Sequence, residues 1–550
     1  TIRFGSVTQS SYVRGVCSDN KGNVYVTGQW QGWFQPSDYG GGGLTANYSA
    51  TLNMFVAKYS YDISGSPAIK WWARLMNAGG GDGNVAFDIA TDPGSNVYVV
   101  GQYPSNTTLY HSEGTAWGTL AWVAGARDSF LVKYDANGFV QWATKQSGAA
   151  GETAFSVTTD ASSNIYVSGS YGNGLLSVYN QSGTVAFTRA TSGLTSIFLV
   201  KYDTTGVASW ASNCLATGNA EGYKVKVDSQ SNVYVCGYFN GTLTISSGAG
   251  VTWGTRVATA GQDAILIKYN TSGSVQWASR AGTAGSDAHW GATVDAEGNV
   301  YVTGYYNGNL VIYNGSDILY SKVLPQFTGQ DCHLIKFDTS GSVLWATRMG
   351  SGGSDIAYNM TSDSTSNVFI IGYFNGNMSF WNATSNVPAW STLNNFGGQD
   401  IFIAQYDKNG NFIQATRHVG GGADIGYAIA CDASGPGLTF WGGQSVSQNF
   451  YPSRAVNQGK MPYYFYNYGA VCGSTFFPPV NTQDGWANAI QPAATSVAQI
   501  NSVTCDAQGN VFVAGYHTGP LTLYSSSGVA SGALGSLADQ GFVAKYLTTG

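Results

Sequence analysis

Charged residues are scarce in this chain of 550 residues, where Asp, Glu, Lys and Arg together make up only 10%. The 24 basic and 30 acidic residues give a formal net charge of −6, which argues against a nucleic-acid partner bound through a basic face. Long apolar runs are missing as well. No stretch approaches the roughly eighteen consecutive apolar residues of a transmembrane helix, so we predict no membrane span.

Cysteine and histidine are also rare. The seven cysteines are an odd number and do not make a complete disulfide framework, and Cys214 with Cys236 is the one pair that merits a test. The five histidines show no metal-ligand spacing: His111, His289, His333, His418 and His517. No nucleophile elbow, phosphate loop or dinucleotide fingerprint stands in a supporting context. We therefore predict no cofactor and no catalytic residue, while metal binding stays open.

Glycine is abundant, with 74 residues, beside 43% apolar and 14% aromatic residues. This composition excludes a disordered chain and is typical of short strands joined by many turns. The chain opens with Thr1-Ile2-Arg3 rather than with Met, so we expect a processed product or an excerpt of a longer precursor.

Two phrases recur along the chain. Asn-apolar-Tyr-Val-x-Gly, with small variations, begins at Asn23, Asn96, Asn164, Asn232, Asn299, Asn367 and Asn510, and residues 437–442 hold a degraded copy. Apolar-apolar-Lys-Tyr, also with variations, ends at Tyr59, Tyr134, Tyr202, Tyr269, Phe337, Tyr406 and Tyr546, and we place its missing copy at 475–477. Successive copies of the first phrase lie 67 to 73 residues apart. Eight repeats of about 69 residues therefore account for the chain.

Each repeat predicts four strands. In the repeat from Glu152 to Ser212 we expect them at 154–160, 164–169, 197–202 and 207–212, with a variable stretch between the second and third. The middle strands are apolar at nearly every position, which indicates that both of their faces are covered. Four-stranded antiparallel sheets repeated radially are propeller blades. The predicted fold class is all-β, a single eight-bladed β-propeller of four-stranded antiparallel blades.

The chain ends favour one closed ring. The last repeat stops after its third strand, and residues 1–5 match the end of a fourth strand at 346–350. We expect residues 1–6 to pair with the C-terminal blade and complete it, which removes an open sheet edge. Residues 1–550 are therefore predicted to form one β-propeller domain.

One copy of the repeat carries a family resemblance best. In this copy Trp345-Ala346-Thr347-Arg348 leads to Gly352-Gly353-Ser354-Asp355, Asp363, Asn367-Val368-Phe369-Ile370, Gly397-Gly398-Gln399-Asp400, Tyr406-Asp407 and Gly410. The pattern resembles the SBBP β-propeller repeat over essentially the whole chain. The resemblance implies a propeller, of seven blades where this chain counts eight. It implies no particular reaction, and it is typical of secreted, cell-surface or virus-encoded proteins.

Two repeated features are expected to be structural. An aromatic residue stands in nearly every second strand and a Trp in most fourth strands, which suits packing between blades better than a ligand platform. Asp-x-x-Gly turns, such as 135–138 and 203–206, invite a calcium interpretation, but each offers few of the about six to eight oxygens that Ca²⁺ takes. The Asp is expected to accept hydrogen bonds from its own turn instead.

The candidate ligand site lies where the loops before the innermost strands meet near the axis. These Gly-rich loops carry one acidic residue each: Glu152, Glu221, Asp287, Asp355 and Asp424. Their carboxylates can bind a cation or a polyhydroxyl ligand, or each can accept N–H bonds from its own loop. The variable stretches, expected to open on the same face, are rich in Tyr, Trp, Asn, Ser and Thr and add Tyr238 and Trp381 as ligand-binding candidates.

We therefore hypothesise a non-catalytic propeller that acts in structural assembly or in recognition through its loop-bearing face. The expected partners are protein neighbours in a surface assembly or glycans. The expected location is extracellular, on a cell surface or on a virus particle. The alternative is a carbohydrate-active enzyme or a lectin that uses the axial carboxylates.

Overall fold

Strands alternate with tight turns throughout the part of the chain that the structure describes, and this part contains no helix. The computed structural model describes residues 2–4, 11–34, 47–61, 67–77, 83–123, 125–190, 194–395, 397–419, 423–431, 438–446, 449–451, 468–476, 487–492, 498–506, 510–518, 521–524, 530–534 and 540–546. The paired strands are antiparallel and form sheets that do not close on themselves. The all-β prediction is confirmed.

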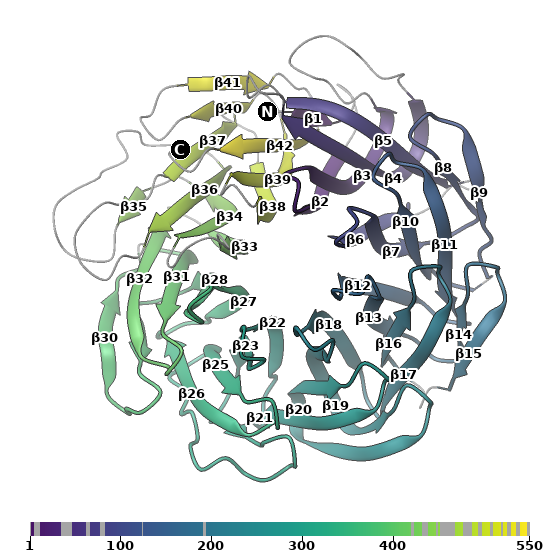
Figure 1. Ribbon diagram of the computed structural model, residues 1–550. Helices are drawn as coiled ribbons and strands as arrows, with labels where there is room; N and C mark the ends of the chain where they lie inside the picture. Colours follow the sequence, from purple (N-terminus) through teal and green to yellow (C-terminus); the bar gives the residue numbers. More distant parts are fainter. Residues whose placement is uncertain are drawn as a thin grey trace.

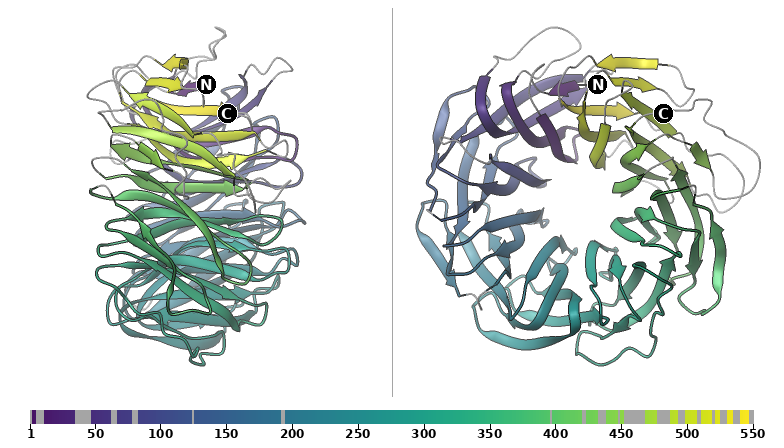
Figure 2. Two further views of the ribbon diagram at one scale, coloured as in Figure 1. Left: turned by 90° about the vertical axis from the view of Figure 1, so that its left-hand side faces the viewer. Right: turned by 180° about the vertical axis from the view of Figure 1, so that it is seen from behind.

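Consecutive strands of one repeat form a four-strand unit whose first strand lies nearest the centre of the molecule, and the units stand side by side around that centre (Figures 1 and 2). From the centre outward the units are β2 (Ser11–Ser18), β3 (Val24–Phe34), β4 (Asn47–Tyr61), β5 (Pro67–Asn77); β6 (Val85–Thr91), β7 (Val97–Tyr103), β10 (Asp128–Tyr134), β11 (Val140–Ser147); β12 (Glu152–Thr159), β13 (Ile165–Tyr171), β16 (Ser196–Tyr202), β17 (Ala208–Ala216); β18 (Ala220–Val227), β19 (Val233–Ser246), β20 (Thr252–Tyr269), β21 (Val275–Gly282); β22 (Ala288–Val294), β23 (Val300–Tyr306), β25 (Asp331–Phe337), β26 (Val343–Gly350); β27 (Ile356–Ser362), β28 (Val368–Phe374), β31 (Asp400–Tyr406), β32 (Phe412–Val419); β33 (Ile425–Cys431), β34 (Leu438–Val446), β36 (Tyr468–Phe476), β37 (Ala487–Pro492); and β38 (Ala498–Cys505), β39 (Val511–His517), β42 (Gln540–Tyr546), β1 (Ile2–Phe4).

The variable stretches form further strands instead of loops beside the axis, so their expected position is wrong. In the units after the first, each stretch pairs with the outermost strand of the preceding unit, as β14 does with β11, and so extends that sheet outward (Figure 1). These added strands are β8 (Thr107–Tyr110), β9 (Ala116–Leu120), β14 (Leu176–Tyr179), β15 (Val185–Arg189), β24 (Val311–Ile312), β29 (Met378–Trp381), β30 (Pro388–Leu393), β35 (Asn449–Tyr451), β40 (Leu521–Tyr524) and β41 (Ala530–Leu534). β19 and β20 are long enough to serve two units.

The two chain ends lie in the same sector of the molecule (Figure 2). β1 pairs antiparallel with β42, with Ile2 opposite Val543 and Phe4 opposite Gly541. β1 is therefore the outermost strand of the sheet β38-β39-β42-β1, the position that a fourth strand takes in the other units.

A hydrogen-bonded turn explains why Asn and Tyr recur at fixed spacing. After β12, Asp160 accepts hydrogen bonds from the backbone N–H groups of Ser162 and Asn164 at 2.9 Å, from Asn164 Nδ2 at 2.8 Å and from Tyr166 Oη at 3.0 Å. The same set recurs in other units, for example at Asp19 and Asp228. The second-strand Tyr is fully buried, so its hydroxyl needs this acceptor.

The recurring Lys and Trp join neighbouring units. Lys201 Nζ and Trp210 Nε1 both donate to the carbonyl oxygen of Thr271, at 3.1 Å each, and Thr271 lies in the turn between the third and fourth strands of the next unit. The same double contact recurs at four other interfaces of the described chain. The turn carbonyl thus ties one unit to the next, and the repeated aromatic residues are structural.

The weakest copies of the repeat also form strands. Residues 438–442 of the degraded second-strand copy fall within β34, which pairs with β33, and Phe476 of the displaced third-strand copy ends β36 opposite Leu438. Cys214 and Cys236 are both free and buried, so the one disulfide that the sequence left for testing does not form.

Candidate functional site

The five predicted acidic residues lie where the innermost strands begin. Glu152 starts β12, Glu221 is the second residue of β18, and Asp287, Asp355 and Asp424 each stand just before an innermost strand. All except the half-buried Glu221 are buried. Their shared position at one edge of the sheets follows the prediction, but their burial changes what the carboxyls can do.

Two of these carboxyls are bound by their own loops. Asp287 accepts hydrogen bonds from Thr283 N at 2.6 Å, Thr283 Oγ1 at 3.0 Å and Asn307 N at 2.9 Å. Asp355 is bound in the same way by Ser351 and Asn375. Glu152 accepts one bond, from Gly148 N at 2.9 Å. The sequence left open whether these carboxyls bind a ligand or accept N–H bonds from their own loops, and these contacts favour the second interpretation.

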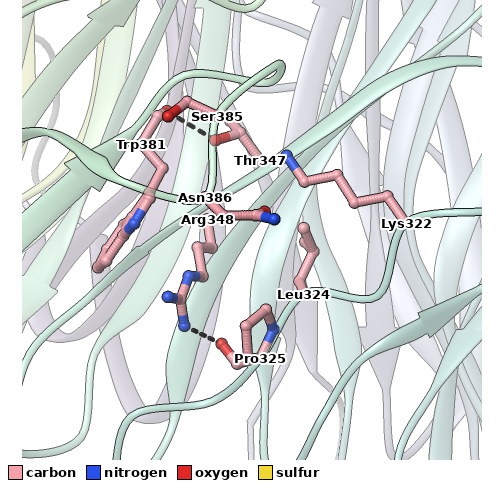
Figure 3. A pocket seen from close by; sticks show the side chains of 8 residues that line it. All are labelled: Lys322, Leu324, Pro325, Thr347, Arg348, Trp381, Ser385 and Asn386. Atoms are coloured by element: carbon pink, nitrogen blue, oxygen red, sulfur yellow. Dashed lines mark hydrogen bonds between the residues drawn. The ribbon is translucent and has the colours of Figure 1, made fainter.

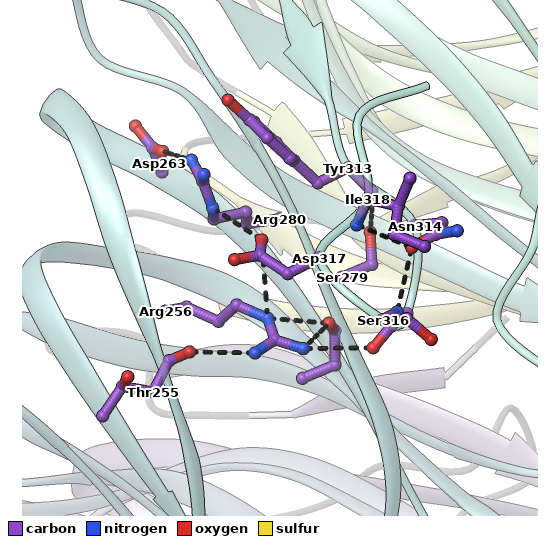
Figure 4. A network of polar contacts seen from close by, with 12 residues as sticks. Thr255, Arg256, Asp263, Ser279, Arg280, Tyr313, Asn314, Ser316, Asp317 and Ile318 are labelled. Carbon is purple, nitrogen blue, oxygen red and sulfur yellow. Dashed lines mark hydrogen bonds and ion pairs between the residues drawn. The ribbon is translucent and has the colours of Figure 1, made fainter. Parts of the chain in front are cut away.

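A second set of carboxyls, missed in the sequence, stands beside the first. Asp128 and Asp331 begin the third strands β10 and β25, Asp263 lies within the long third strand β20, and all three are fully buried. Each precedes one of the predicted acidic residues of the next repeat by 24 positions, a regular spacing that could have revealed them. Asp263 belongs to a polar network in which Arg280 lies between it and Asp317, at 3.5 and 3.0 Å (Figure 4).

The innermost strands also carry an arc of aromatic side chains. Each innermost strand contains a β-bulge at an equivalent position. We call the aromatic residues at these bulges the axial arc, and all are half-buried: Phe87, Phe155, Tyr223, Trp290, Tyr358 and Tyr427. Their ring centroids lie 5.7, 5.8, 4.3, 5.9 and 5.5 Å apart in succession. A bulge re-aims one side chain per strand, and here it lines up six aromatic residues across neighbouring units.

Polar residues occupy the two bulges that remain. Arg14 is exposed and donates to Gln29 at 3.3 Å, and Asn501 donates to the carbonyl oxygen of Val13 at 2.7 Å. The centre of the molecule therefore has an aromatic sector and a polar sector. This division was not predicted from the sequence, because the aromatic residues at the bulges do not share the regular positions of those in the second and fourth strands.

Tyr238, a predicted ligand-binding residue, lies against the axial arc. Its ring centroid is 5.7 Å from that of Tyr223, and it is one of the buried residues of β19. Burial raises the pKa of Tyr238 to about 12, so its phenol stays protonated at neutral pH. Burial also raises the pKa of Glu221, which lies one strand away.

Trp381, the other aromatic candidate, lies far out in its sheet. It is buried on β29, which pairs with the outermost strand β26 of the preceding unit. The Arg348 guanidinium lies 4.1 Å from its ring centroid and the Phe327 ring 5.2 Å from it. Both Trp381 and Arg348 line a small pocket (Figure 3). The structure therefore separates Trp381 from the axial candidates.

Apolar side chains are exposed on peripheral strands and on the turns beside them, which we call the outer rim. They come from three sheets: Val185, Val251, Trp253, Val257, Ile318, Leu319, Val323 and Val387. Val387 is 71% exposed and Val257 56%. β15 and β30 are each the last strand of their sheet in the described part, so their outward backbone groups have no strand partner there.

The described residues contain no group of three His, Cys, Asp or Glu side chains placed to hold a metal ion. Two of the histidines do meet. His289 Nδ1 and His333 Nε2 lie 2.8 Å apart, and both side chains are fully buried. Burial lowers the pKa of His333 to about 3 and that of His289 well below its usual value. Both are therefore neutral at pH 7. The search of the same residues for a helix able to span a membrane found none.

No family model matches the chain. It is 26% identical over 572 residues to an uncharacterized WD repeat-containing protein of Acanthamoeba polyphaga mimivirus, an alignment that covers 91% of this chain and 40% of that protein. The chain thus spans less than half the length of this relative.

Among solved structures, the chain was compared with the extracellular domain of a putative hybrid two-component system of B. thetaiotaomicron. The two are 11% identical over 98% of this chain and 78% of that chain, with a TM-score of 0.18, a value too low to support an argument. The likeness to the mimivirus protein, with the repeated antiparallel sheets, indicates a β-propeller-type repeat protein.

Proposed function

We propose that residues 1–550 form one eight-bladed β-propeller that serves as a non-catalytic scaffold for protein neighbours. The blade count is supported by the four-strand units around a common centre, and closure is supported by the pairing of β1 with β42. The SBBP-type repeat remains the proposed repeat class.

The observation that carries the scaffold proposal is the outer rim. Exposed apolar side chains that gather on one surface mark interaction sites, and here they recur on the peripheral strands and turns of three sheets. An unpaired sheet edge also offers backbone N–H and C=O groups for strand addition. The rim therefore suits a protein partner that packs an apolar surface or adds a strand. The proposed contact surface is therefore the outer rim and not the loop-bearing face.

The proposed setting is a surface assembly, on a virus particle, on a cell or outside it. A viral relative with a WD-repeat description supports this setting. A weakly charged chain suits contact with neighbours of either charge.

The rim is tested by the double variant Trp253→Lys, Val257→Lys. We expect unchanged folding, because both side chains are exposed, and at least a tenfold loss of co-sedimentation with the native assembly. Leu344→Lys is the matched control, since Leu344 is exposed on β26 outside the rim, and it should co-sediment normally. Equal co-sedimentation of the double variant would rule out the rim as the contact surface.

Closure is tested by removing residues 1–6. We expect a lower melting temperature, because β42 would lose its outer partner β1 and expose a sheet edge. Differential scanning calorimetry of the shortened and full chains measures the effect. An unchanged transition would contradict closure by these residues.

Glycan binding is the second candidate, and the axial arc favours it. Aromatic faces beside the carboxyl of Glu221 and the polar sector of Arg14 and Asn501 are the kind of groups that can contact both the apolar face and the hydroxyls of a sugar. A glycan array tests it, and Trp290→Ala should abolish any binding found. Binding that survives this substitution would exclude the axial arc as the site.

A further inference from the structure

A buried pair of carboxyls lies at four interfaces between neighbouring units. At one of them, beside Asp400, Asp424 N donates to the carbonyl of Gln399 at 2.6 Å, and the other three share a fuller set of contacts. In each of these three pairs, an Asp of a third strand faces the acidic residue that opens the next unit. The backbone N–H of the second acid donates to the carbonyl of the residue before the first, at 2.8, 2.9 and 2.6 Å. The three pairs are Asp128 with Glu152, Asp263 with Asp287, and Asp331 with Asp355.

The side chains within a pair are also close. A Cβ built on Gly282 would lie 2.2 Å from the Asp263 carboxyl, and the next residue, Thr283, donates its N–H to Asp287 at 2.6 Å. Gly350 and Ser351 repeat this arrangement between Asp331 and Asp355. Both carboxyls therefore flank the same short backbone segment.

One oxygen in each of these three pairs has no partner. Oδ2 of Asp128, Asp263 and Asp331 accepts a backbone N–H from the preceding loop, at 2.9, 2.9 and 2.7 Å. Oδ1 of the same three residues is buried without a hydrogen-bond partner among the described residues. A buried acceptor left unpaired costs about 1–3 kcal/mol. The same unpartnered acceptor recurs at three interfaces.

The surrounding charges do not neutralise two carboxylates. Lys145 Nζ lies 3.9 Å from Asp128, Arg280 Nη1 lies 3.5 Å from Asp263, and Arg348 is the cation that acts on Asp331. Arg280 is also shared with Asp317 at 3.0 Å. The remaining titratable neighbours are neutral. The phenols of Tyr103, Tyr305 and Tyr306 face Asp128, Asp287 and Asp331, and the Cys332 thiol and the Tyr373 phenol face Asp355. Two ionised carboxyls would leave a buried excess of negative charge, which is strongly unfavourable.

We propose that each of these three interfaces binds one proton, shared between its two carboxyls with the unpartnered Oδ1 as an acceptor, and that loss of this proton at alkaline pH weakens the contact between neighbouring units. On release, one carboxyl O–H bond breaks and the proton passes to water. The contact between neighbouring units therefore depends on pH at these interfaces. A calcium ion suits the unpartnered Oδ1 less well, because it takes about six to eight oxygens.

The titration range follows from burial. Desolvation raises the pKa of Asp263 and of Asp331 to about 7, that of Asp355 to about 8 and that of Glu152 to about 9. These folded-state values lie above the unfolded values of 3.8 and 4.5. Stability is therefore fully present below the unfolded pKa and is lost as pH rises from the unfolded values through the folded values. The loss is steepest between about pH 5 and 7, where all four groups are still protonated in the folded chain only.

The test measures the melting temperature of the full chain from pH 5 to 9, beside the double variant Asp263→Asn, Asp331→Asn. An uncharged amide keeps the shape of each Asp and can donate to the remaining carboxylate. We expect the melting temperature of the wild type to fall relative to that of the variant as pH rises from 5 to 9, with the variant higher at pH 9 by at least about 2 °C but not at pH 5. Asp203→Asn, the same change in an exposed turn, should follow the wild type.

Infrared spectroscopy supplies a second readout. The carbonyl band of protonated carboxylic acid should be present at pH 6, disappear by pH 9 and be weaker in the double variant. If that variant does not fold, Glu152→Gln makes the same test at the first pair. The proposal would be overturned if the melting temperature of the variant declined with pH as steeply as that of the wild type, or if the carboxylic acid band were absent. A melting temperature at pH 7 that calcium chloride raises in the wild type alone would also overturn it, because that would make a metal ion the partner of Oδ1.

Discussion

Two sets of buried aspartates repeat through this molecule with opposite electrostatics. Asp160, in the turn after an innermost strand, is 4% exposed, and Asp263, at the opposite edge of the sheets, is 0% exposed. Burial alone would raise the pKa of both. For Asp160 the hydrogen bonds from Asn164 and Tyr166 outweigh burial and lower its pKa, whereas the pKa of Asp263 rises to about 7.

The number of donors explains the difference. Asp160 receives four hydrogen bonds that stabilise its charged form, while one Asp263 oxygen has no donor and a second carboxyl is near. The aspartates that recur in the turns therefore stabilise a single unit at neutral pH. An aspartate repeated at the interface makes the contact between units depend on pH.

The largest expected effect comes from removing the aspartate side chain of a buried turn. Asp160→Ala should lower the free energy of unfolding by about 3 kcal/mol, because it leaves the buried Tyr166 hydroxyl and the Asn164 amide without their charged acceptor. Chemical unfolding followed by fluorescence measures this. Asp160→Asn retains one acceptor oxygen and should cost less. Equal losses from both variants would show that charge and donor count do not govern the turn.

Acid should weaken the molecule through the histidine pair as well as through the turns. His333 has a folded pKa of about 3 against an unfolded 6.5, so its stability is present above pH 6.5 and lost as pH falls towards 3. At pH 5 the loss for this group is about 2 kcal/mol. Melting temperatures between pH 4 and 7 measure it.

The matched variant for this acid effect is His289→Ala, His333→Phe. Ala154 and Phe198 occupy the equivalent positions around Gly169 in another unit, so the substitution copies a packing that the fold already uses. The double substitution should reduce the decline in melting temperature between pH 6.5 and 5. It should leave the decline below pH 4, which comes from protonation of the turn aspartates. An unchanged acid profile would assign the decline to other groups.

The smallest effect is expected at an exposed turn. Asp203→Asn should change the free energy of unfolding by less than about 0.5 kcal/mol, because Asn270 already accepts the same turn hydrogen bonds one unit further on. Chemical unfolding checks this. A larger loss would mean that the negative charge itself matters in these exposed turns.

Much of the fold could be predicted because it depends on local patterns that repeat. The strands expected at 154–160, 164–169, 197–202 and 207–212 correspond to β12, β13, β16 and β17. The expected pairing of the N-terminal residues with the last repeat corresponds to β1 on β42. Alternation of β-branched and aromatic residues with Gly and Asp turns carries this information within a few residues.

The site was predicted only in part. The sequence placed Asp287 and Asp355 at the start of innermost strands, but it did not reveal the carboxyls of Asp263 and Asp331 beside them, because these belong to the preceding repeat. Trp290 was missed in a different way. A single-residue bulge, which no local pattern marked, turns this side chain towards Tyr223 and Tyr358.

The sequence by itself determined the repeat, the strand order and the residues of each turn, since all of these are fixed by neighbours along the chain. Only the tertiary structure decided which carboxyls share an interface, which aromatic residues form the axial arc and that the variable stretches extend the preceding sheet. These contacts join residues from different units, and their energies depend on burial and donor count, which exist only once the units are packed together.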